Sequence, residues 1–306
     1  MLKIALGSIP YYWPRASVLS FYEAMAEPAV DIVYLGETVC SRRHEIKLDD
    51  WLDIAAKLSA AGKEVVLSTL VLIESGADLT ALRKITVNGR YVVEANDMGA
   101  VHSLSAQHIP FIAGPHLNVY NEPTLGLLAH LGAKRWVTPL EMGREGLVQL
   151  RDEFALDAVS DMETEVFIYG RMPLAFSARC FTARYRNLPK DNCQFSCIDY
   201  PDGLLLQTKE SNAFLILNGI QTQSARVCNL ISEIPQMQSM GVDVVRISPQ
   251  HQYTGQIIDI VDRVRLGLCS PQQGFVLSQE WMPDASCNGY WYGDPGQDLR
   301  VEAMAD

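Results

Sequence analysis

The chain lacks a long uninterrupted apolar run. Its most apolar stretch, residues 65–73, is broken by Ser68 and Thr69, whereas a membrane-spanning helix needs about 18 consecutive apolar residues. The apolar start of the chain is interrupted within a few residues by Pro10 to Arg15 and shows no small-residue cleavage site, so it does not fit a signal peptide. We therefore expect a cytoplasmic protein without a membrane span.

Positive charge is also scarce. The 306 residues include 25 lysines and arginines against 36 aspartates and glutamates, and the net charge is −11. An acidic surface repels a nucleic-acid backbone or an anionic membrane, so neither is expected to be the main partner. Because 48% of the residues are hydrophobic, the chain can bury a large core.

Several sequence motifs of well-known sites are missing. The chain contains no Gly-x-Gly-x-x-Gly or Walker sequence, which leaves nucleotide binding without support. It also contains no His-Glu-x-x-His zinc-protease motif and no Gly-x-Ser-x-Gly nucleophile turn. The sequence therefore offers no recognisable set of residues for proteolysis.

Seven cysteines are present, an odd number that argues against a disulfide framework in a chain without an export signal. Cys180, Cys193 and Cys197 lie close together in a polar segment, and Cys40 lies far upstream in Leu-Gly-Glu-Thr-Val-Cys-Ser-Arg-Arg. Four thiolates can hold zinc or an iron–sulfur cluster. Zinc sites usually show two short Cys-x2-4-Cys pairs, so this looser spacing favours a 4Fe–4S cluster.

The other three cysteines carry less information. Cys228 and Cys269 lie in apolar contexts that we interpret as helical, where a thiol packs as a small hydrophobic group. A polar turn surrounds Cys287 and leaves its role open.

Short apolar segments alternate with helical patterns along the chain, which predicts parallel strands joined by crossover helices. An eightfold repeat favours a closed (β/α)8 TIM-like barrel over a doubly wound open sheet, which is the alternative. The predicted strands are 4–6, 31–35, 64–70, 91–95, 110–113, 135–138, 165–169 and 242–247. We expect one barrel domain over residues 1–306, with a cysteine-bearing insertion after the seventh strand (171–213), irregular in structure, and a C-terminal extension (270–306).

A closed barrel has a consequence for the cysteines. Cys40 follows the second predicted strand and Cys180 follows the seventh. The ends of both strands lie on the rim where such barrels keep their active sites. We therefore expect the four thiols to converge there.

Polar residues after other strands are candidates for a pocket on the same rim. We expect Glu37, Asn96, His116, Asn118 and Glu141 to line it. Capping of the next helix is the simpler role for some of these positions, such as Asn96-Asp97 before Met98. No catalytic residue can be assigned.

Two groups of residues resemble a known family. Glu165-Val-Phe-Ile-Tyr-Gly170 leading through Arg179 to Cys180 resembles the signature of the U32 peptidase-like family. Residues 34–43, the opening Tyr11-Tyr-Trp-Pro14, and Asn288-Gly-Tyr-Trp291 are similar to members of that family that act in ubiquinone biosynthesis.

The resemblance implies a 4Fe–4S cluster on Cys40, Cys180, Cys193 and Cys197. It also implies a heterodimer with a UbiU-like sister subunit, help from a UbiT-like lipid-binding accessory protein, and oxygen-independent hydroxylation of an aromatic quinone precursor under anaerobic conditions. Two alternatives stay open. One is a U32-type peptidase or other hydrolase, or an RNA-modifying relative. The other is a non-catalytic scaffold with a structural zinc ion.

Overall fold

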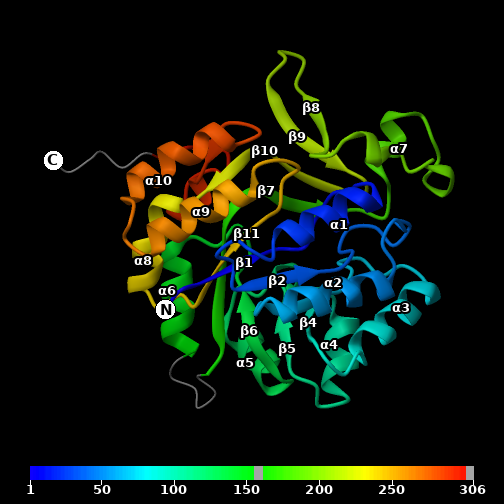
Figure 1. Cartoon of the computed structure of the whole chain (residues 1–306), viewed down its shortest axis with the longest axis horizontal. Helices are drawn as coiled ribbons and strands as arrows, with labels where there is room; N and C mark the ends of the chain where they lie inside the picture. Colours follow the sequence, from blue (N-terminus) through cyan, green and yellow to red (C-terminus); the bar gives the residue numbers. More distant parts are fainter. Residues whose placement is uncertain (155–160, 301–306) are drawn as a thin grey trace.

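The computed structural model describes residues 1–154 and 161–300 and contains a closed barrel of parallel strands (Figure 1). Strand β11 pairs with β1 on one side and with β7 on the other, which closes the ring. The expected TIM-like barrel is confirmed. Its strands are β1 (Lys3–Leu6), β2 (Ile32–Leu35), β3 (Glu64–Ser68), β4 (Val92–Ala95), β5 (Phe111–Ala113), β6 (Ala133–Val137), β7 (Glu163–Phe176) and β11 (Val244–Ile247).

Amphipathic helices surround the barrel. In α2, Ile54, Ala55 and Leu58 recur at three- and four-residue spacing and are buried on one face. Asp49 and Asp50 lie in the first turn of this helix, where negative charge is favourable. The helices around the barrel are α1 (Arg15–Ala24), α2 (Leu48–Ala60), α3 (Gly76–Thr86), α4 (Met98–Ser105), α5 (Glu122–His130), α6 (Arg144–Phe154), α8 (Ile234–Ser239) and α9 (Thr254–Arg265).

The alternation of side chains along each strand separates two environments. Val33 and Leu35 belong to the large hydrophobic core that includes residues of the surrounding helices, whereas Ile32 and Tyr34 belong to a small apolar cluster of strand residues. Charged residues on the strands are buried as well, among them Glu94, Arg135, Glu165 and Arg246. The interior of this barrel is therefore partly ionic.

The segment after the seventh strand has more regular structure than expected. Strand β7 continues to Phe176 and pairs antiparallel with β10 (Gln221–Asn229), which pairs with β9 (Ala213–Asn218) and then β8 (Leu204–Gln207). Figure 1 shows β8 and β9 projecting from the barrel, with α7 (Phe181–Tyr185) beside them. The stretch from Gly170 to Phe214, which shows no sustained sequence period, therefore contains paired strands. The β7–β10 pairing joins residues about fifty positions apart, whereas β8 and β9 form a local hairpin.

The same sheet corrects the interpretation of Cys228. This residue lies in strand β10 rather than in a helix, and its register partner is Cys287 in β12 (Ser286–Cys287). Both thiols are buried. Cys269 is also buried, but it lies in a bend beyond the end of α9 rather than in a helix.

The C-terminal part of the chain continues with α10 (Pro271–Ser278) and β12, which pairs with β10. Residues 301–306, the end of the expected C-terminal extension, lie outside the described residues. Within residues 1–154 and 161–300, no helix combines the length and the apolar character that crossing a membrane requires.

Candidate functional site at the barrel mouth

Cys40 lies in a tight turn directly after strand β2. Gly36 begins this turn with φ +129°, and a Cβ at this position would lie 2.6 Å from the carbonyl oxygen of Ser68. The Glu37 carboxylate then accepts hydrogen bonds from the backbone amides of Val39 (2.8 Å) and Cys40 (3.0 Å). Glu37 therefore shapes the cysteine turn, and burial raises the pKa of its carboxyl group even though Arg43 is close.

The other three cysteines lie in the segment after β7. The sulfur of Cys180 accepts a hydrogen bond from the amide of Ala183 (3.4 Å) at the start of α7. Cys193 follows a short 3-10 turn, and Cys197 lies in the next one (Ser196–Asp199). Between them, Gln194 and Phe195 both have φ of 51°. Two successive left-handed residues that are not glycine store strain, and such strain concentrates at functional sites.

The two segments meet on one rim of the barrel. The Cys40 and Cys180 thiols are close enough to interact electrostatically, and so are those of Cys180 and Cys197. Arg42 joins the two segments, because its Nη2 donates a 2.7 Å hydrogen bond to the carbonyl oxygen of Asp191. Burial raises the pKa of Cys40 to about 11 and also raises that of Cys197. Cys193 is buried and directly follows the 3-10 turn Lys190–Asn192, which contains Asp191.

The donor chemistry at this rim fits a thiolate-bound cluster. All four cysteines are free thiols. The Arg43 guanidinium lies beside Cys40 and Cys197, and its buried Nε has no hydrogen-bond partner in the described part of the chain. An orphaned cationic N–H next to thiols suits an anionic sulfur centre. Over residues 1–154 and 161–300, no three histidine, cysteine, aspartate or glutamate side chains are grouped as ligands of a metal ion.

A second feature of the rim is a cavity of about 60 Å³ over the ends of the barrel strands, here called the barrel-mouth cavity. Its walls come from the loops after several strands and from the extended part of β7 and β10. Its polar lining residues are Ser8, Thr38, Glu94, Asn96, His116, Arg171, Gln221, Gln223, Arg246 and Ser248.

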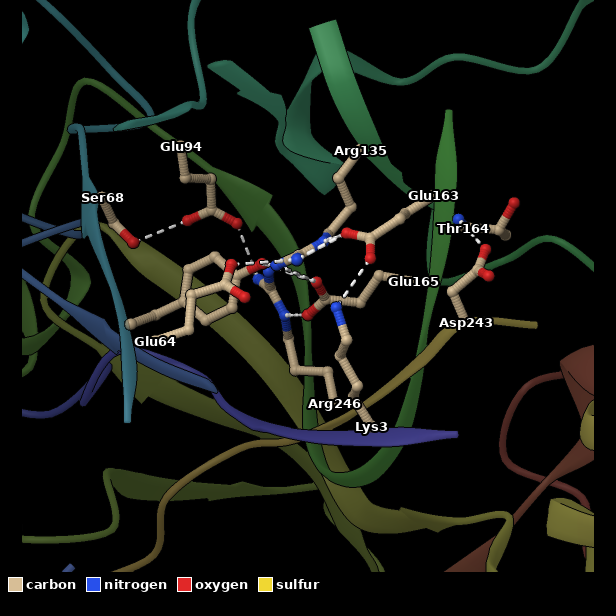
Figure 2. Close-up of polar contacts among 11 residues, drawn as sticks. Lys3, Glu64, Ser68, Glu94, Arg135, Glu163, Thr164, Glu165, Asp243 and Arg246 are labelled. Carbon is tan, nitrogen blue, oxygen red and sulfur yellow. Dashed lines mark hydrogen bonds and ion pairs between the residues drawn. The ribbon is translucent and has the colours of Figure 1, made fainter. Parts of the chain in front are cut away.

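Arg246 lines this cavity and is part of a network of polar contacts between strands (Figure 2). Its Nε donates a 2.6 Å hydrogen bond to Glu165 Oε1, and its Nη1 lies 2.8 Å from Glu94 Oε1. Its guanidinium carbon lies 4.0 Å from the centre of the Tyr34 ring. Burial alone would lower the pKa of Arg246, but Glu165 and Glu94 raise it, so the charge is held in place.

The network continues into the barrel, as Figure 2 shows. The Tyr34 hydroxyl donates a 2.5 Å hydrogen bond to Glu165 Oε2, and Arg135 Nη1 donates a 3.1 Å bond to the same hydroxyl. Ser68 Oγ donates to Glu94 Oε2 at 2.7 Å. Each buried carboxylate therefore has several partners, as buried charges require.

Several polar atoms in the cavity walls are buried without a partner in the described residues. They are Arg246 Nη2, Asn96 Oδ1, Gln223 Oε1 and Arg171 Nε. A buried polar group without a hydrogen bond costs about 1–3 kcal/mol, so such groups gathered in one cavity indicate a site for a polar ligand or water. The two arginine nitrogens can donate a hydrogen bond, and the two amide oxygens can accept one.

His116 connects the cavity to a wider cleft of about 490 Å³, here called the outer cleft. The outer cleft is lined by His116, Asn118, Tyr120, Leu140, Glu141, Leu174 and Phe176, among others. The His116 ring contacts the Phe176 ring edge-on at 4.8 Å. Burial lowers the pKa of His116 to about 4, so the imidazole is neutral near pH 7.

The five pocket candidates from the sequence thus fall in three places. Asn96 and His116 line the barrel-mouth cavity, and Asn118 and Glu141 line the outer cleft with His116. Glu37 lies in the Cys40 turn instead. The capping role belongs to Asp97, which accepts a 2.6 Å hydrogen bond from the amide of Gly99.

Sequence reasoning missed Glu94, Arg171, Gln221 and Gln223, which also line the cavity, and Glu165, which holds Arg246. A signal was present for the carboxylates. Glu94 lies inside an apolar strand segment and Glu165 begins one, and a charge in a buried strand must find a partner on another strand.

Comparison with known proteins now adds to this geometry. The model of the family described as Peptidase family U32 matches residues 18–282. The chain belongs to peptidase family U32.

Relatives of this U32 protein include two bacterial proteins with related names. The tRNA hydroxylation protein P1 of Bacillus subtilis is 26% identical over 183 residues, which cover 53% of this chain and 43% of that protein. The tRNA hydroxylation protein P of Helicobacter pylori is 31% identical over 90 residues, 29% of this chain and 20% of that protein. This U32 chain therefore matches less than half the length of either relative.

Solved structures similar to the U32 chain include two enzymes. The N-acetylneuraminate lyase from Mycoplasma synoviae has a TM-score of 0.46 at 9% identity, covering 90% of this chain and 79% of the lyase. Tryptophan synthase from M. tuberculosis has a TM-score of 0.43 at 12% identity, covering 91% of each chain.

Proposed function

We propose that this chain is the iron–sulfur subunit of an oxygen-independent hydroxylase complex in anaerobic ubiquinone biosynthesis, a UbiV-like member of family U32. The observation that supports this best is the meeting of the Cys40 turn with the Cys180–Cys197 segment around a buried arginine. Cys40, Cys180, Cys193 and Cys197 would hold a 4Fe–4S cluster. Such a cluster would supply one-electron transfer or a Lewis acid.

The residues of the chain itself have separate roles in this proposal. The barrel-mouth cavity orients a polar group of the aromatic quinone precursor through the unpartnered atoms of Arg246 and Asn96. The outer cleft, with Phe176 and Tyr120 in its wall, receives the ring and its substituents. Neutral His116, at the boundary of the two spaces, can donate or accept a hydrogen bond.

The partners in this proposal are a UbiU-like sister subunit, which forms a heterodimer with this chain in the cytoplasm, and a UbiT-like accessory protein that binds lipid. Anaerobic co-expression with the sister subunit, followed by size-exclusion chromatography, tests the heterodimer. Elution of the two chains in separate peaks at micromolar concentration contradicts it.

The cluster is tested by anaerobic purification and reconstitution. We expect brown protein with the broad visible absorption of an iron–sulfur cluster and with equal iron and labile sulfide. Serine at any of the four cysteine positions should abolish the colour and anaerobic quinone synthesis while the circular dichroism spectrum is retained. Cys269→Ser is the matched control, because that buried thiol lies beyond the end of α9, outside both cysteine-bearing segments.

Two results would redirect the assignment. Colourless protein that carries zinc, with serine variants that unfold, indicates the structural zinc scaffold. Cleavage of peptides that survives replacement of all four cysteines indicates a U32-type hydrolase.

RNA hydroxylation is a second candidate, favoured by the names of the two curated relatives. The net charge of −11 argues against it, because binding to tRNA requires neutralisation of phosphates by cations. Mass spectrometry of nucleosides from tRNA of a deletion strain separates the two functions. Loss of a hydroxylated nucleoside with normal quinone levels supports RNA as the substrate.

A further inference from the structure

The cysteine centre and the barrel-mouth cavity are joined by one buried side chain. Arg43 is 7% exposed and lies beside Cys40 and Cys197. Its Nη1 donates a 2.7 Å hydrogen bond to the carbonyl oxygen of Pro10 and lies 3.3 Å from Glu37 Oε1. Pro10 is also part of the cavity wall. The Arg43 guanidinium therefore contacts both the cysteine turn and the wall of the barrel-mouth cavity.

A second path runs from Arg43 to the cavity through side chains alone. Arg43 Nη2 donates a 2.7 Å hydrogen bond to Asn218 Oδ1, and Asn218 Nδ2 donates a 2.8 Å bond to Gln221 Oε1. Asn218 and Gln221 are each 2% exposed, and Gln221 lines the cavity. Buried hydrogen-bond chains of this kind polarise one another and fix a single geometry.

The turn between β9 and β10 holds the third part of this junction. The amide of Phe181, the residue after Cys180, donates a 2.8 Å hydrogen bond to Gly219 O. The amide of Gly219 donates to Thr182 Oγ1 at 3.0 Å. Gly219 has φ +66°, and a Cβ at this position would lie 3.4 Å from Arg43 Nη2. Cys180, Arg43 and Gln221 are thus anchored to the same four-residue turn.

We propose that Arg43 is a positioning residue that couples the barrel-mouth cavity to the cysteine centre. A ligand that engages Gln221 shifts Asn218 and thereby the guanidinium beside Cys197, and a change of charge at the sulfurs acts back on the cavity by the same route. Such coupling is reciprocal for binding equilibria. The inference rests on the proposed function only in taking the cysteines as a redox centre, whose potential depends on nearby charges and hydrogen bonds.

A matched pair of variants on strand β10 tests the path. Gln221→Leu removes the bond to Asn218. Gln223→Leu changes the same cavity wall, but Gln223 contacts Tyr11, and no contact to Asn218 or Arg43 is found for it among the described residues. Arg43→Gln removes the charge, and Arg43→Lys keeps the charge without the planar fork.

The first readout is the midpoint potential of the reconstituted protein, from a redox titration followed by electron paramagnetic resonance. Arg43→Gln should reduce the equilibrium constant for one-electron reduction about tenfold, which is about 59 mV, because a cation stabilises the reduced centre. Gln221→Leu should shift the potential in the same direction by less, Arg43→Lys should restore part of the loss, and Gln223→Leu should match the wild type.

The second readout needs no cluster. In cluster-free protein, alkylation of Cys197 by iodoacetamide is followed by mass spectrometry, with Cys269, which lies beyond the end of α9 and outside both cysteine-bearing segments, in the same digest as the internal reference. Gln221→Leu should change the Cys197 rate relative to Cys269, and Gln223→Leu should not. Equal behaviour of the two variants in both readouts overturns the coupling even where a cluster assembles. Failure to assemble any cluster, with the expected alkylation pattern, overturns the proposed function and leaves the coupling supported.

Discussion

Arg246 Nε donates a 2.6 Å hydrogen bond to Glu165 Oε1 across the interior of the barrel, between neighbouring strands β11 and β7. Glu165 is fully buried, and Tyr34 donates to its other oxygen. This pair fixes the guanidinium in the wall of the barrel-mouth cavity, where Nη2 has no hydrogen-bond partner among residues 1–154 and 161–300. The ionic interior of the barrel is therefore part of the candidate site.

Glu165→Gln should be strongly destabilising. It leaves Arg246 and Arg135 facing a neutral amide in the interior, and breaking a buried ion pair costs about 3–5 kcal/mol. Urea denaturation followed by circular dichroism measures the free energy of unfolding. Asp259→Asn is the control. Asp259 and its ion-pair partner Arg263 are 70% and 46% exposed, so the loss of this pair should cost less than about 1 kcal/mol. Equal losses in the free energy of unfolding for the two variants would show that the Glu165 pair stabilises the fold no more than an exposed ion pair does.

Gly36→Ala should disturb the cysteine turn. The positive φ of Gly36 and the 2.6 Å approach of a new Cβ to Ser68 O both oppose alanine, and strain of this kind costs about 1–3 kcal/mol. We expect lower iron content after reconstitution and a lower free energy of unfolding. Gly255→Ala, in helix α9 with open space around the added Cβ, should instead leave iron content unchanged. Full iron loading of Gly36→Ala would argue that this turn does not position Cys40.

The pH dependence of stability should carry a signature of His116. Burial lowers its pKa in the folded protein to about 4, against about 6.5 in the unfolded chain. Between these values the unfolded state binds more protons, so this contribution is fully present above pH 6.5 and is lost as pH falls towards 4. Since the imidazole is only partly buried, we expect about 1–2 kcal/mol.

The comparison variant for this experiment is His116→Gln. Denaturation curves at pH 7 and pH 4.5 give the free energy of unfolding at each pH. The loss between the two pH values should be smaller in this variant than in the wild type, by about 1–2 kcal/mol. An identical pH dependence in the two proteins would mean that His116 stays exposed to water in solution.

Trp13→Phe should loosen the segment that carries the cysteines. Trp13 is 2% exposed, and its Nε1 donates a 2.6 Å hydrogen bond to the carbonyl oxygen of Pro201. Phenylalanine keeps most of the packing but removes this bond, which is worth about 1 kcal/mol. Limited proteolysis should then cut residues 186–203 faster. Trp51→Phe, on helix α2, should leave the cleavage rate of this segment unchanged, and a similar acceleration in both variants would point to a general loss of stability.

Much of the barrel could be read from local patterns. The spacing of Ile54, Ala55 and Leu58 identifies helix α2, and the apolar segment around Val33 identifies strand β2, because burial of one helical face or of a whole strand leaves a local periodicity. The strands β8 to β10 left no such trace. Strand β8 is largely exposed and β9 is exposed at its start, so neither shows a regular alternation of buried residues, although the β8–β9 and β9–β10 pairings are local hairpins.

The cysteines illustrate the same division. Their residue type and polar sequence neighbours indicated thiolate chemistry, because both can be seen in the amino-acid sequence. Their meeting with Arg43, Asn218 and Gln221 depends on the β9–β10 turn. The Asn218-Gly219 pair is a local hairpin signal, but the contact of this turn with Arg43 joins segments 175 positions apart, which no local pattern gives.

Composition, periodicity and spacing predicted a parallel barrel, its helices and the presence of cysteines at its rim. The tertiary structure decided which charged strand residues form ion pairs inside the barrel and which polar atoms of the cavity wall have no partner among the described residues. It also decided which arginine lies between the thiols and the cavity. The physical reason is that a buried charge or an orphaned donor is defined by neighbours in space. Those neighbours come from strands that meet only when the ring closes.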